Sequence, residues 1–553
     1  MENRWLRTRI ALVSANRSGG AYEQSFGVNF PPLAAASLAA VAHEQGYEAK
    51  LFDASPLHIG NSHLASLILE YDPDISAFIV NSSSSAGSSA EVARMIKKSG
   101  QIIVAGGHHA TFAYPSLLKK GFDVVFLGEG EISFSRFLSR IKRGEEWRDL
   151  VGIAFLDGGK PVATGKAPMV ERLDELPMPK FEIFNRDNYK MGIFDPDGSV
   201  ITIETSRGCP YNCEYCSVTR MWGAKWRLKS FSRVIEELKK VRELGYRWVF
   251  FVDDNFIIPL KRAVEEKIRL LQEMIKTGLN SLHYIVQLRA DFVAKNNWLP
   301  KMLKEAGVKV AFLGIESGDM ETLARMRKNL SLDLSTRAVS MLSHSGIIVH
   351  GGFILGAPHE GYAAIKRTID FATSLINYGL DSAQFSIYTP LPGTESFEKA
   401  LINGDLLTLD WDLYDILHPV MRTKLSPPIL FFIQRFAQYY FFLRKGIWSL
   451  ARGRLFSEPK TEKDKLLHAG TKFLFENIPR NILGLLALPL SSFTLFLKLR
   501  RGMSREEKEE LKDIAQAETV LSPTFAVFIK RKKAYSLSGR ENDGSRAWRR
   551  KRD

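Results

Sequence analysis

The stretch Cys209-Pro210-Tyr211-Asn212-Cys213-Glu214-Tyr215-Cys216 holds all three cysteines of the 553-residue chain. Thiolates are soft ligands that select iron–sulfur clusters, zinc or copper(I). A structural zinc site would want a fourth protein ligand, and the nearby sequence offers no obvious Cys or His for that place. Three cysteines can instead hold a 4Fe-4S cluster in which one iron is left open. Chance clustering of three structural cysteines explains the stretch poorly, so it indicates a metal-cluster site.

The cysteine stretch directly follows an apolar strand, and five more strands come after it, separated by helical patterns such as Ser230–Leu244 and Leu260–Thr277. Strands that alternate with helices predict a parallel sheet, here a partial parallel α/β barrel. Active sites of such barrels lie on loops at the carboxyl ends of the strands, where the cysteines fall. The expected strands are Val200–Glu204, Trp248–Val252, Tyr284–Leu288, Val310–Gly314, Val349–Ile354 and Ser382–Ser386.

The first 145 residues also alternate strands and helices, which predicts a doubly wound parallel sheet. Ligands of such sheets bind beyond the carboxyl ends of the strands. Small and glycine residues at these ends leave room for a large flat ligand, although turns of the chain alone also account for them. The expected strands are Arg9–Ser14, Glu48–Phe52, Asp74–Asn81, Gln101–Ala105 and Asp123–Leu127, and the expected helices include Pro32–Gln45 and Ser88–Lys98.

Two pairs of polar residues follow these strands. His108 and His109 could ligate a metal, but adjacent histidines on a loop are more often capping or surface residues. Glu129 and Glu131 could face a ligand, or they could cap the helix that begins near Ser133.

The order of predicted strands and helices divides the chain into four segments and predicts an α/β fold with a mostly helical C-terminal region. Asp157-Gly158-Gly159-Lys160 is expected to form a hairpin turn inside the connector. The segments are the N-terminal sheet domain (1–145), the connector (146–196), the partial barrel (197–420) and a basic, apolar-aromatic helical region with a disordered tail (421–553).

The net charge of +15 lies entirely in the last segment. Residues 421–553 contain 28 Lys and Arg against 13 Asp and Glu, whereas the first 420 residues hold equal numbers of each. Two basic clusters, Lys530–Lys533 and Arg546–Arg552, could attract anionic lipid headgroups. Nucleic acid is a less suitable partner, because the aromatic residues lie in apolar runs rather than on an open basic groove.

Two apolar stretches of the same segment suggest contact with a membrane. Arg435 near the middle of Ile429–Trp448 argues against a spanning helix, and Asn481–Leu497 is shorter than a span requires. Lying in the interface is therefore expected rather than crossing it, although these helices could instead cap the barrel. Met1–Leu6 lacks the apolar core of a secretory signal, so we expect a cytoplasmic protein at the inner face of the membrane.

The Cx3CxxC stretch, with an aromatic residue before its last cysteine, resembles the radical S-adenosylmethionine superfamily. The N-terminal domain, with its Gly106-Gly107-His108 and Gly128-Glu129-Gly130-Glu131 loops, resembles that of the branch that carries a cobalamin-binding domain. The resemblance covers roughly residues 9–400. Later segments agree with it in order: Phe251-Val252-Asp253-Asp254-Asn255-Phe256, Gln287-Leu288-Arg289-Ala290-Asp291, Leu313-Gly314-Ile315-Glu316-Ser317, Gly351-Gly352-Phe353-Ile354-Leu355-Gly356 and Thr389-Pro390-Leu391-Pro392-Gly393-Thr394.

The resemblance implies three cofactors: a 4Fe-4S cluster, S-adenosyl-L-methionine and cobalamin. Cys209, Cys213 and Cys216 would hold the cluster. The residues implied for binding S-adenosylmethionine at the cluster are Tyr215, Asp253, Asp254, Arg289, Glu316, Gly351, Gly352 and Gly356. Those implied for binding cobalamin are Ser83, Gly106, Gly107, His108, Gly128 and Glu129.

The implied reaction is removal of hydrogen from an unactivated carbon by a 5′-deoxyadenosyl radical, with a ferredoxin- or flavodoxin-type electron donor. Three cysteines leave none for an auxiliary cluster or for the paired catalytic cysteines of RNA-methylating relatives. We expect a hydrophobic, membrane-associated substrate and ring closure on an isoprenoid lipid of the tetraether type. The alternatives are cobalamin-dependent C-methylation of the hopanoid type, oxidative cyclisation of a porphyrin ester, and a non-catalytic binding or regulatory protein with a vestigial cluster.

Overall fold

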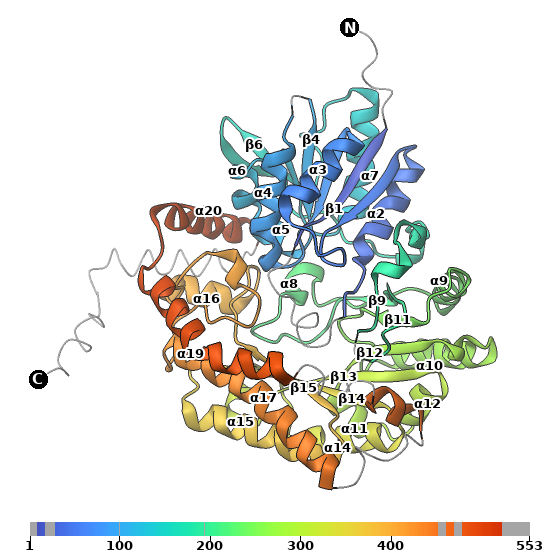
Figure 1. The fold of residues 1–553 in the computed structure, drawn as a ribbon. Helices are drawn as coiled ribbons and strands as arrows, with labels where there is room; N and C mark the ends of the chain where they lie inside the picture. The colour runs from blue at the N-terminus through green and yellow to red at the C-terminus, as the bar shows by residue number, and fades with distance from the viewer. Residues whose placement is uncertain are drawn as a thin grey trace, which may run out of the picture.

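The structure is a computed structural model of the chain and describes residues 8–16, 28–98, 100–192, 194–451, 461–468 and 478–521. Two sheets with their helices make up the body of the molecule, the N-terminal one in blue and the second in green and yellow (Figure 1). Helices coloured orange and red follow at the C-terminal end. The predicted α/β fold with a helical C-terminal region is confirmed.

Within the described residues the first sheet has the strand order β2-β1-β3-β4-β5-β6-β7. The first five strands pair in parallel, and β3 is buried along its whole length, as expected for a strand covered by helices on both faces. These strands are β1 (Arg9–Ser14), β2 (Glu48–Asp53), β3 (Ile75–Ile79), β4 (Ile102–Gly106) and β5 (Val124–Phe126). The helices are α2 (Leu33–Glu44), α3 (Asn61–Tyr71), α4 (Ala86–Ile96), α5 (His108–Phe112), α6 (Tyr114–Lys119) and α7 (Gly130–Arg143).

The first sheet continues into the segment that the sequence assigns to the connector. β6 (Ile153–Asp157) pairs antiparallel with β5, and β7 (Lys160–Ala163) pairs antiparallel with β6 across the predicted turn. The first three residues of β6 are buried, so this hairpin packs as part of the sheet. The N-terminal domain therefore extends past the expected boundary at residue 145.

The second sheet has the order β15-β14-β13-β12-β11-β8, so each new strand is added in parallel at the same edge. All six expected strands are confirmed: β8 (Val200–Ile203), β11 (Trp248–Phe251), β12 (His283–Arg289), β13 (Val308–Glu316), β14 (Ile348–Leu355) and β15 (Ser382–Ile387). A two-stranded hairpin, β9 (Ser206–Arg207) with β10 (Arg227–Leu228), brackets the cysteine loop. The helices are α8 (Val218–Trp222), α9 (Phe231–Glu243), α10 (Lys261–Lys276), α11 (Ala290–Lys295), α12 (Leu299–Glu305), α13 (Met320–Arg325), α14 (Leu332–His344), α15 (Tyr362–Ser374) and α16 (Glu395–Asn403).

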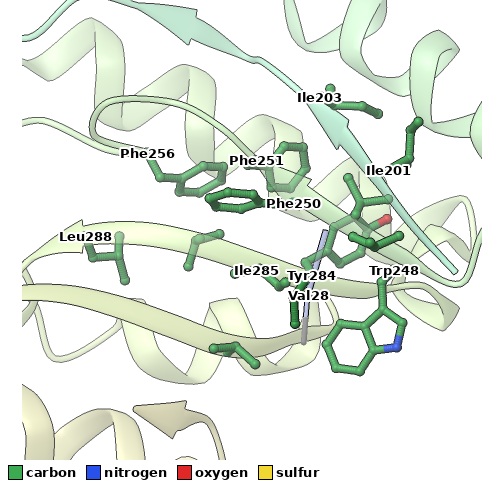
Figure 2. Packing of buried hydrophobic residues seen from close by; sticks show 14 of the residues in the cluster. Val28, Ile201, Ile203, Trp248, Phe250, Phe251, Phe256, Tyr284, Ile285 and Leu288 are labelled. Atoms are coloured by element: carbon green, nitrogen blue, oxygen red, sulfur yellow. The ribbon is translucent and has the colours of Figure 1, made fainter. Parts of the chain in front are cut away.

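Aromatic side chains form the core of the second domain beside β11 and β12. The rings of Phe251 and Tyr284 stack with centroids 5.3 Å apart, and Trp248 is fully buried (Figure 2). Val28, which precedes α2 in the N-terminal domain, is 4% exposed and belongs to the same cluster (Figure 2). Large rings buried on adjacent strands supply much of the apolar area that holds such a sheet together.

The segment before α2 ties the two domains together. The ring of Phe30 lies 4.7 Å from that of Phe250, and Thr202 Oγ1 donates a 2.8 Å hydrogen bond to the carbonyl oxygen of Pro31. Because Thr202 lies on β8, this contact places the start of the cysteine loop directly beside the N-terminal domain. The carboxyl ends of both sheets therefore border a common region.

The long helix α17 (Pro427–Ala451) covers the edge strand β15. Gln434 Nε2 donates to the Phe385 carbonyl at 2.7 Å, and Gln438 Nε2 donates to the Ala383 carbonyl at 2.8 Å. The backbone N–H of Phe385 in turn donates to Gln438 Oε1 at 3.1 Å. These amides satisfy edge groups that a further strand would otherwise pair. The stretch Ile429–Trp448 is thus docked on the barrel through one of its faces.

Two more helices follow α17: α19 (Ile478–Arg500), which contains the predicted stretch Asn481–Leu497, and α20 (Arg505–Leu521). α20 packs against α6 in the N-terminal domain, where Lys120 Nζ lies 3.0 Å from Glu510 Oε1. Among the described residues, none of the helices combines the length and apolarity needed to cross a bilayer. The basic clusters predicted near the C-terminus lie outside the described residues.

Candidate active site

The three cysteines lie on the loop between the two short strands of the β9–β10 hairpin. Gly208, which precedes Cys209, has a φ of +92°, and a Cβ there would lie 2.4 Å from the Lys225 carbonyl oxygen. This position therefore requires glycine. Among the cysteines, Glu214 accepts hydrogen bonds from Tyr388 Oη at 3.0 Å and from Lys399 Nζ at 2.6 Å. The loop is therefore held at its start and beside Cys213, and its thiols line a cavity.

This cavity, which we name the cluster cavity, has a volume of about 360 Å³. It lies at the carboxyl ends of the strands of the second sheet. Of the predicted residues, those that line it are Cys209, Cys213, Cys216, Tyr215, Asp254, Arg289, Glu316 and Gly352. Among the described residues, no three His, Cys, Asp or Glu side chains surround a point as the ligands of one metal ion would.

The adjacent carboxylates Asp253 and Asp254 have different surroundings. Asp253 lies outside the cavity and accepts hydrogen bonds from Thr205 N at 2.9 Å and Ser206 Oγ at 2.6 Å. Lys267 Nζ, also buried, lies 3.8 Å from Asp253. Asp253 therefore fastens the strand end that leads into the cysteine loop. Asp254 faces the cavity, and burial raises the pKa of its carboxyl group to about 7.

The predicted Arg289 is held in place by its neighbours. Its Nε donates to Asp291 Oδ1 at 3.0 Å, and its Nη2 donates to the Lys328 carbonyl at 3.0 Å. The guanidinium carbon lies 3.7 Å from the ring centroid of Tyr211, within the cysteine loop. Arg289 thus connects the end of β12 to the cysteine loop by a cation–π contact.

Glu316 has a backbone conformation that is unusual for a residue other than glycine. Its φ is +68°, and the pairing of β13 with β14 shifts register between Gly314 and Glu316. Lys328 Nζ donates to Glu316 Oε1 at 2.7 Å. Burial, together with the Glu316 carboxylate, raises the pKa of Tyr215 well above its ordinary value. Left-handed conformations of this kind cost energy and are concentrated at functional sites.

The three predicted glycines of β14 and its loop serve different roles. Gly352 lines the cluster cavity, and the nearest atom to a Cβ there would be the Leu313 carbonyl oxygen at 3.8 Å. Gly351 lies in the packed core, where a Cβ would meet three side chains at 3.0–3.3 Å. Gly356 has a φ of +81° and donates its N–H to Glu360 Oε2 at 2.7 Å. Gly351 and Gly356 therefore lie outside the cavity and serve packing and turn formation.

A second cavity of about 430 Å³, which we name the interdomain cavity, lies between the carboxyl ends of the two sheets. The predicted residues Gly106, Gly107, His108, Gly128 and Glu129 all line it. Gly107 has a φ of +121°, and a Cβ there would lie 2.8 Å from the Val80 carbonyl oxygen. At Gly130, in contrast, a Cβ would meet nothing within 4 Å. Glycines therefore form part of the wall, and the space in front of Gly130 is open.

Ser83 and the two histidines are placed differently. Ser83 lies outside the interdomain cavity, and its Oγ lies 2.9 Å from His109 Nδ1. His108 borders the cavity, and its ring meets that of Trp222 edge-on with centroids 5.3 Å apart. Burial lowers the pKa of His108 to about 4, so its imidazole is neutral near pH 7.

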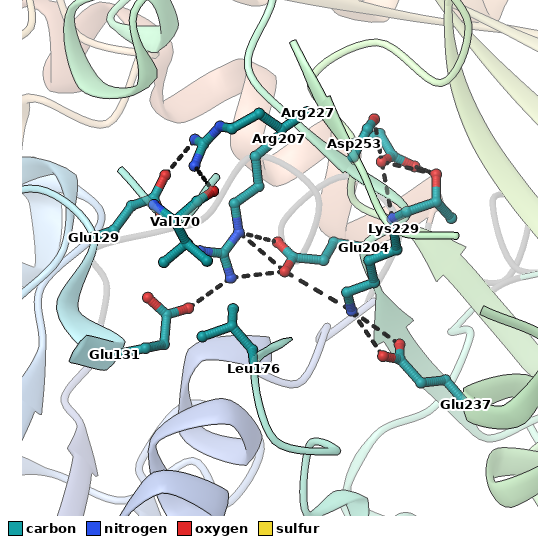
Figure 3. Close-up of polar contacts among 12 residues, drawn as sticks. Glu129, Glu131, Val170, Leu176, Glu204, Arg207, Arg227, Lys229, Glu237 and Asp253 are labelled. Carbon is teal, nitrogen blue, oxygen red and sulfur yellow. Dashed lines mark hydrogen bonds and ion pairs between the residues drawn. The ribbon is translucent and has the colours of Figure 1, made fainter. Parts of the chain in front are cut away.

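Glu129 belongs to a buried network of charges between the domains (Figure 3). Arg207, the residue before Gly208, donates from Nη2 to Glu131 Oε1 at 2.6 Å and from Nε to Glu204 Oε1 at 3.0 Å. Glu129 pairs with Arg227 and accepts from the N–H of Val170 at 2.8 Å. The carboxylate of Glu129 is thus engaged within the protein. The network joins the loop after β5 to the base of the cysteine loop.

Several residues that line or support the two cavities were not predicted from the sequence motifs. Tyr211, Lys328 and Tyr388 line or support the cluster cavity, and Arg207, Trp222 and Phe30 line the interdomain cavity. Tyr211 lies within the cysteine stretch, which is a signal that sequence reasoning could have used. The others come from loops and strand ends that only the folded chain brings together.

Comparisons with known proteins agree with this architecture. A model of the radical SAM superfamily matches residues 203–372, and a model of the B12 binding domain matches residues 21–138. An uncharacterized methyltransferase of Pyrococcus horikoshii is 34% identical over 411 residues, which are 73% of this chain and 86% of that protein. Hopanoid C-3 methylase of Methylococcus capsulatus is 28% identical over 80% of this chain and 82% of its own length.

Two further comparisons concern a cyclase and a solved structure. The anaerobic magnesium-protoporphyrin IX monomethyl ester cyclase of Cereibacter sphaeroides is 28% identical over 75% of this chain and 67% of its own length. The structure of OxsB, a cobalamin-dependent S-adenosylmethionine radical enzyme with aqua-cobalamin and S-adenosylmethionine bound, has a TM-score of 0.63 at 16% identity. That similarity covers 96% of this chain and 82% of OxsB and shows a shared fold.

The three-cysteine loop on one parallel α/β domain, facing a second parallel sheet across a shared region, agrees with both family models. The chain belongs to the radical SAM superfamily and carries a B12-binding domain. It is an enzyme of the methyltransferase or cyclase type, and its cofactors are a 4Fe-4S cluster, S-adenosylmethionine and cobalamin.

The residues present fit these groups. Three thiols line the cluster cavity, and thiolates are the ligands that such clusters require. Gly352 leaves backbone exposed in the same cavity, where an S-adenosyl group could approach closely. In the interdomain cavity, several glycines line the wall, which suits the flat face of a corrin ring, and a Cβ at Gly130 would meet no protein atom within 4 Å.

Proposed function

We propose that the protein is a cobalamin-dependent radical methyltransferase that acts on an unactivated carbon of a hydrophobic substrate. One observation carries this proposal: Asp254 lines both the cluster cavity and the interdomain cavity. The two cavities therefore adjoin, and groups bound in them would face one reaction space. When bound, the cofactors supply a 5′-deoxyadenosyl radical on one side and a methyl group on the other.

The residues of the chain itself would bind, orient and shield the reactants. Cys209, Cys213 and Cys216 would hold the cluster at one wall, and Gly130, where a Cβ would meet no protein atom, would let backbone approach the corrin at the other. Tyr215 and Glu316 lie in the cluster cavity, where they can fix S-adenosylmethionine through hydrogen bonds.

Apolar side chains of the interdomain cavity support a hydrophobic substrate. Phe30, Phe134 and Trp222 border this cavity, and Met221 and Val252 approach from the second domain. A saturated carbon in such a substrate has no acidic hydrogen and no leaving group, so a radical is a suitable way to activate it. A one-electron donor of the ferredoxin or flavodoxin type would supply the reducing equivalent.

Methyl transfer is favoured over the ring closure that the sequence led us to expect. Two of the relatives described above are named methyltransferase or methylase, and one of these acts on a hopanoid. Ring formation is the second candidate, because a relative of similar identity is a porphyrin ester cyclase. An isoprenoid lipid of the tetraether type is one substrate that ring formation would suit.

The fate of a labelled methyl group tests the proposal. Reconstituted protein with cobalamin, a reductant and methyl-labelled S-adenosylmethionine is incubated with a lipid extract from source cells that lack the gene. We expect label in the lipid fraction together with 5′-deoxyadenosine, and neither from a Cys213→Ala variant. An altered but unlabelled lipid together with 5′-deoxyadenosine would support the cyclase instead. If the wild-type protein cleaves no more S-adenosylmethionine than the Cys213→Ala variant, both candidate functions are overturned.

A further inference from the structure

Exposed apolar side chains are concentrated on the two packed helices α17 and α19. Of the 20 large hydrophobic residues that are exposed among the described side chains, nine lie on these helices. Leu443 and Ile447 are 62% and 53% exposed, and Leu490 and Phe493 are 69% and 56% exposed. We call this group the α17–α19 surface. Its members are Ile429, Phe432, Phe436, Leu443, Ile447, Leu490, Phe493, Phe496 and Leu497.

The α17–α19 surface is the outer face of an amphipathic pair. On α17, the exposed residues recur at helical spacing. On the opposite face of this helix, Gln434 and Gln438 donate hydrogen bonds to β15, and Phe431 and Phe441 are buried. On α19, Leu495 and Leu499 are buried beside the exposed Phe496 and Leu497. Because each helix also has a buried face that packs on the protein, the exposed apolar residues belong to well-packed helices.

The charged residues of these two helices are all basic. The sequence contains no Asp or Glu between residues 416 and 457 or between residues 477 and 505. Arg444, Arg500 and Arg501 are exposed on or beside these helices, and the Arg500 guanidinium lies 6.0 Å from the ring of Phe496. An apolar helix face bordered by arginines is suited to the boundary between anionic headgroups and acyl chains.

The surface begins close to the active site. Leu430, next to the exposed Ile429, packs on Gly356 at the end of β14, where a Cβ would lie within 2.4 Å of it. The ring of Phe431 stacks on that of His418 with centroids 5.1 Å apart, and the nearby Ile416 lines the cluster cavity. One short segment therefore runs from the cluster cavity to the first residues of the α17–α19 surface.

We propose that the α17–α19 surface docks the protein on an anionic lipid bilayer, with both helices lying in the interface. A lipid substrate would then enter from the bilayer on the side of the cluster cavity and reach the reaction space that the two cavities share. Only this delivery of substrate rests on the proposed function; the docking itself rests on the exposed residues and their charge. A second copy of the chain is the competing occupant, and the experiment distinguishes the two.

Vesicle flotation of the full-length protein tests the docking. Wild-type protein is mixed at low salt with vesicles of phosphatidylcholine alone or with a third phosphatidylglycerol. Leu443→Glu/Ile447→Glu is the test variant, and Met320→Glu/Tyr362→Glu is the matched control, because those residues are 52% and 63% exposed outside the surface. We expect binding to the anionic vesicles, a loss of at least about tenfold in the test variant and no loss in the control.

Three results would overturn the docking. They are no flotation with anionic vesicles, equal flotation of the test variant and the wild type, or a wild-type dimer in light scattering that the test variant converts to a monomer without any vesicle binding. Methyl transfer to detergent-dispersed lipid is measured in parallel. If methyl transfer occurs without flotation, the docking proposal fails and the proposed function stands. If flotation occurs without methyl transfer, the docking proposal stands and the proposed function fails.

Discussion

The two cavities are built from different parts of the polypeptide. The cluster cavity is walled by side chains with defined chemistry, three thiols, two carboxylates and a guanidinium, which come from the ends of several strands. The interdomain cavity is lined at one side by several glycines, and its charged residues other than Asp254 belong to the buried network of ion pairs. Under the proposed function, we expect the first cavity to select its cofactor by chemistry and the second to select it mainly by shape.

This difference predicts which substitutions each cavity tolerates. Changing one donor atom should be enough to disable the cluster cavity, whereas the interdomain cavity should respond to added volume. The charge network between them should respond to loss of charge, because its members are buried. The following substitutions test these expectations, from the largest effect to the smallest.

Cys213→Ser should abolish the cluster without disturbing the interdomain cavity. Replacing a thiolate by a hydroxyl removes one of three cluster ligands, and we expect reductive cleavage of S-adenosylmethionine to fall to background. Cobalamin binding, followed by its visible absorption, should stay within about twofold of wild type. Ser217→Ala is the control on the same loop. Cleavage at the wild-type rate by the Cys213 variant would contradict the assignment of the cluster site.

Arg207→Met should destabilise the protein by about 3–5 kcal/mol, because it leaves buried carboxylates of Glu131 and Glu204 without their cation. Unfolding in denaturant measures the change. Arg172→Met removes an exposed ion pair and should cost less than about 1 kcal/mol. If both variants lose similar, small amounts of stability, the network does not hold the domains together.

Gly130→Val should weaken cobalamin binding at least about tenfold while the protein stays folded, since a Cβ there meets no atom within 4 Å. Gly60→Val is the matched control: it also begins a helix in open space but lies away from the cavity. Equilibrium titration with cobalamin gives both affinities. Equal affinities for the two variants would show that the glycine wall does not receive the corrin.

Gln438→Ala should cost about 1–3 kcal/mol, because the N–H of Phe385 and the carbonyl of Ala383 lose their side-chain partner at the sheet edge. The cluster cavity should be affected only indirectly, through β15. Gln272→Ala on the exposed face of α10 is expected to change stability by less than about 0.5 kcal/mol. A loss no larger than that of the Gln272 variant would mean that α17 does not protect the edge strand.

The strands and the cysteines could be predicted from the sequence because both signals are local. Each strand is a short apolar run between turn residues, and the three cysteines form one motif. The antiparallel β6–β7 hairpin was missed as part of the first sheet, because its length and turn are equally typical of a connector. The antiparallel pairing of β6 with β5 is what makes the hairpin part of the sheet. Such pairing depends on two distant segments and cannot be predicted from the residues of either one alone.

The roles of neighbouring residues were less predictable. Asp253 and Asp254 are adjacent in the loop after β11, but hydrogen bonds from Thr205 and Ser206 hold Asp253 away from the cavities, so only Asp254 lines them. Gly351 and Gly352 differ because successive residues of a strand, here β14, face opposite sides of the sheet. The role of Arg207 could not be predicted from the sequence, because its ion-pair partners Glu129 and Glu131 are more than seventy residues away in the chain. Long-range contacts of this kind require the folded structure.

The central claim is that the two cavities adjoin at Asp254, so that the cluster and cobalamin act in one reaction space. Electron paramagnetic resonance of protein that carries both cofactors tests it most directly. With the cluster reduced and cobalt in the Co(II) state, we expect faster relaxation and broadening of the cobalt signal, absent from Cys213→Ser. A cobalt signal that is identical with and without the reduced cluster would contradict the claim.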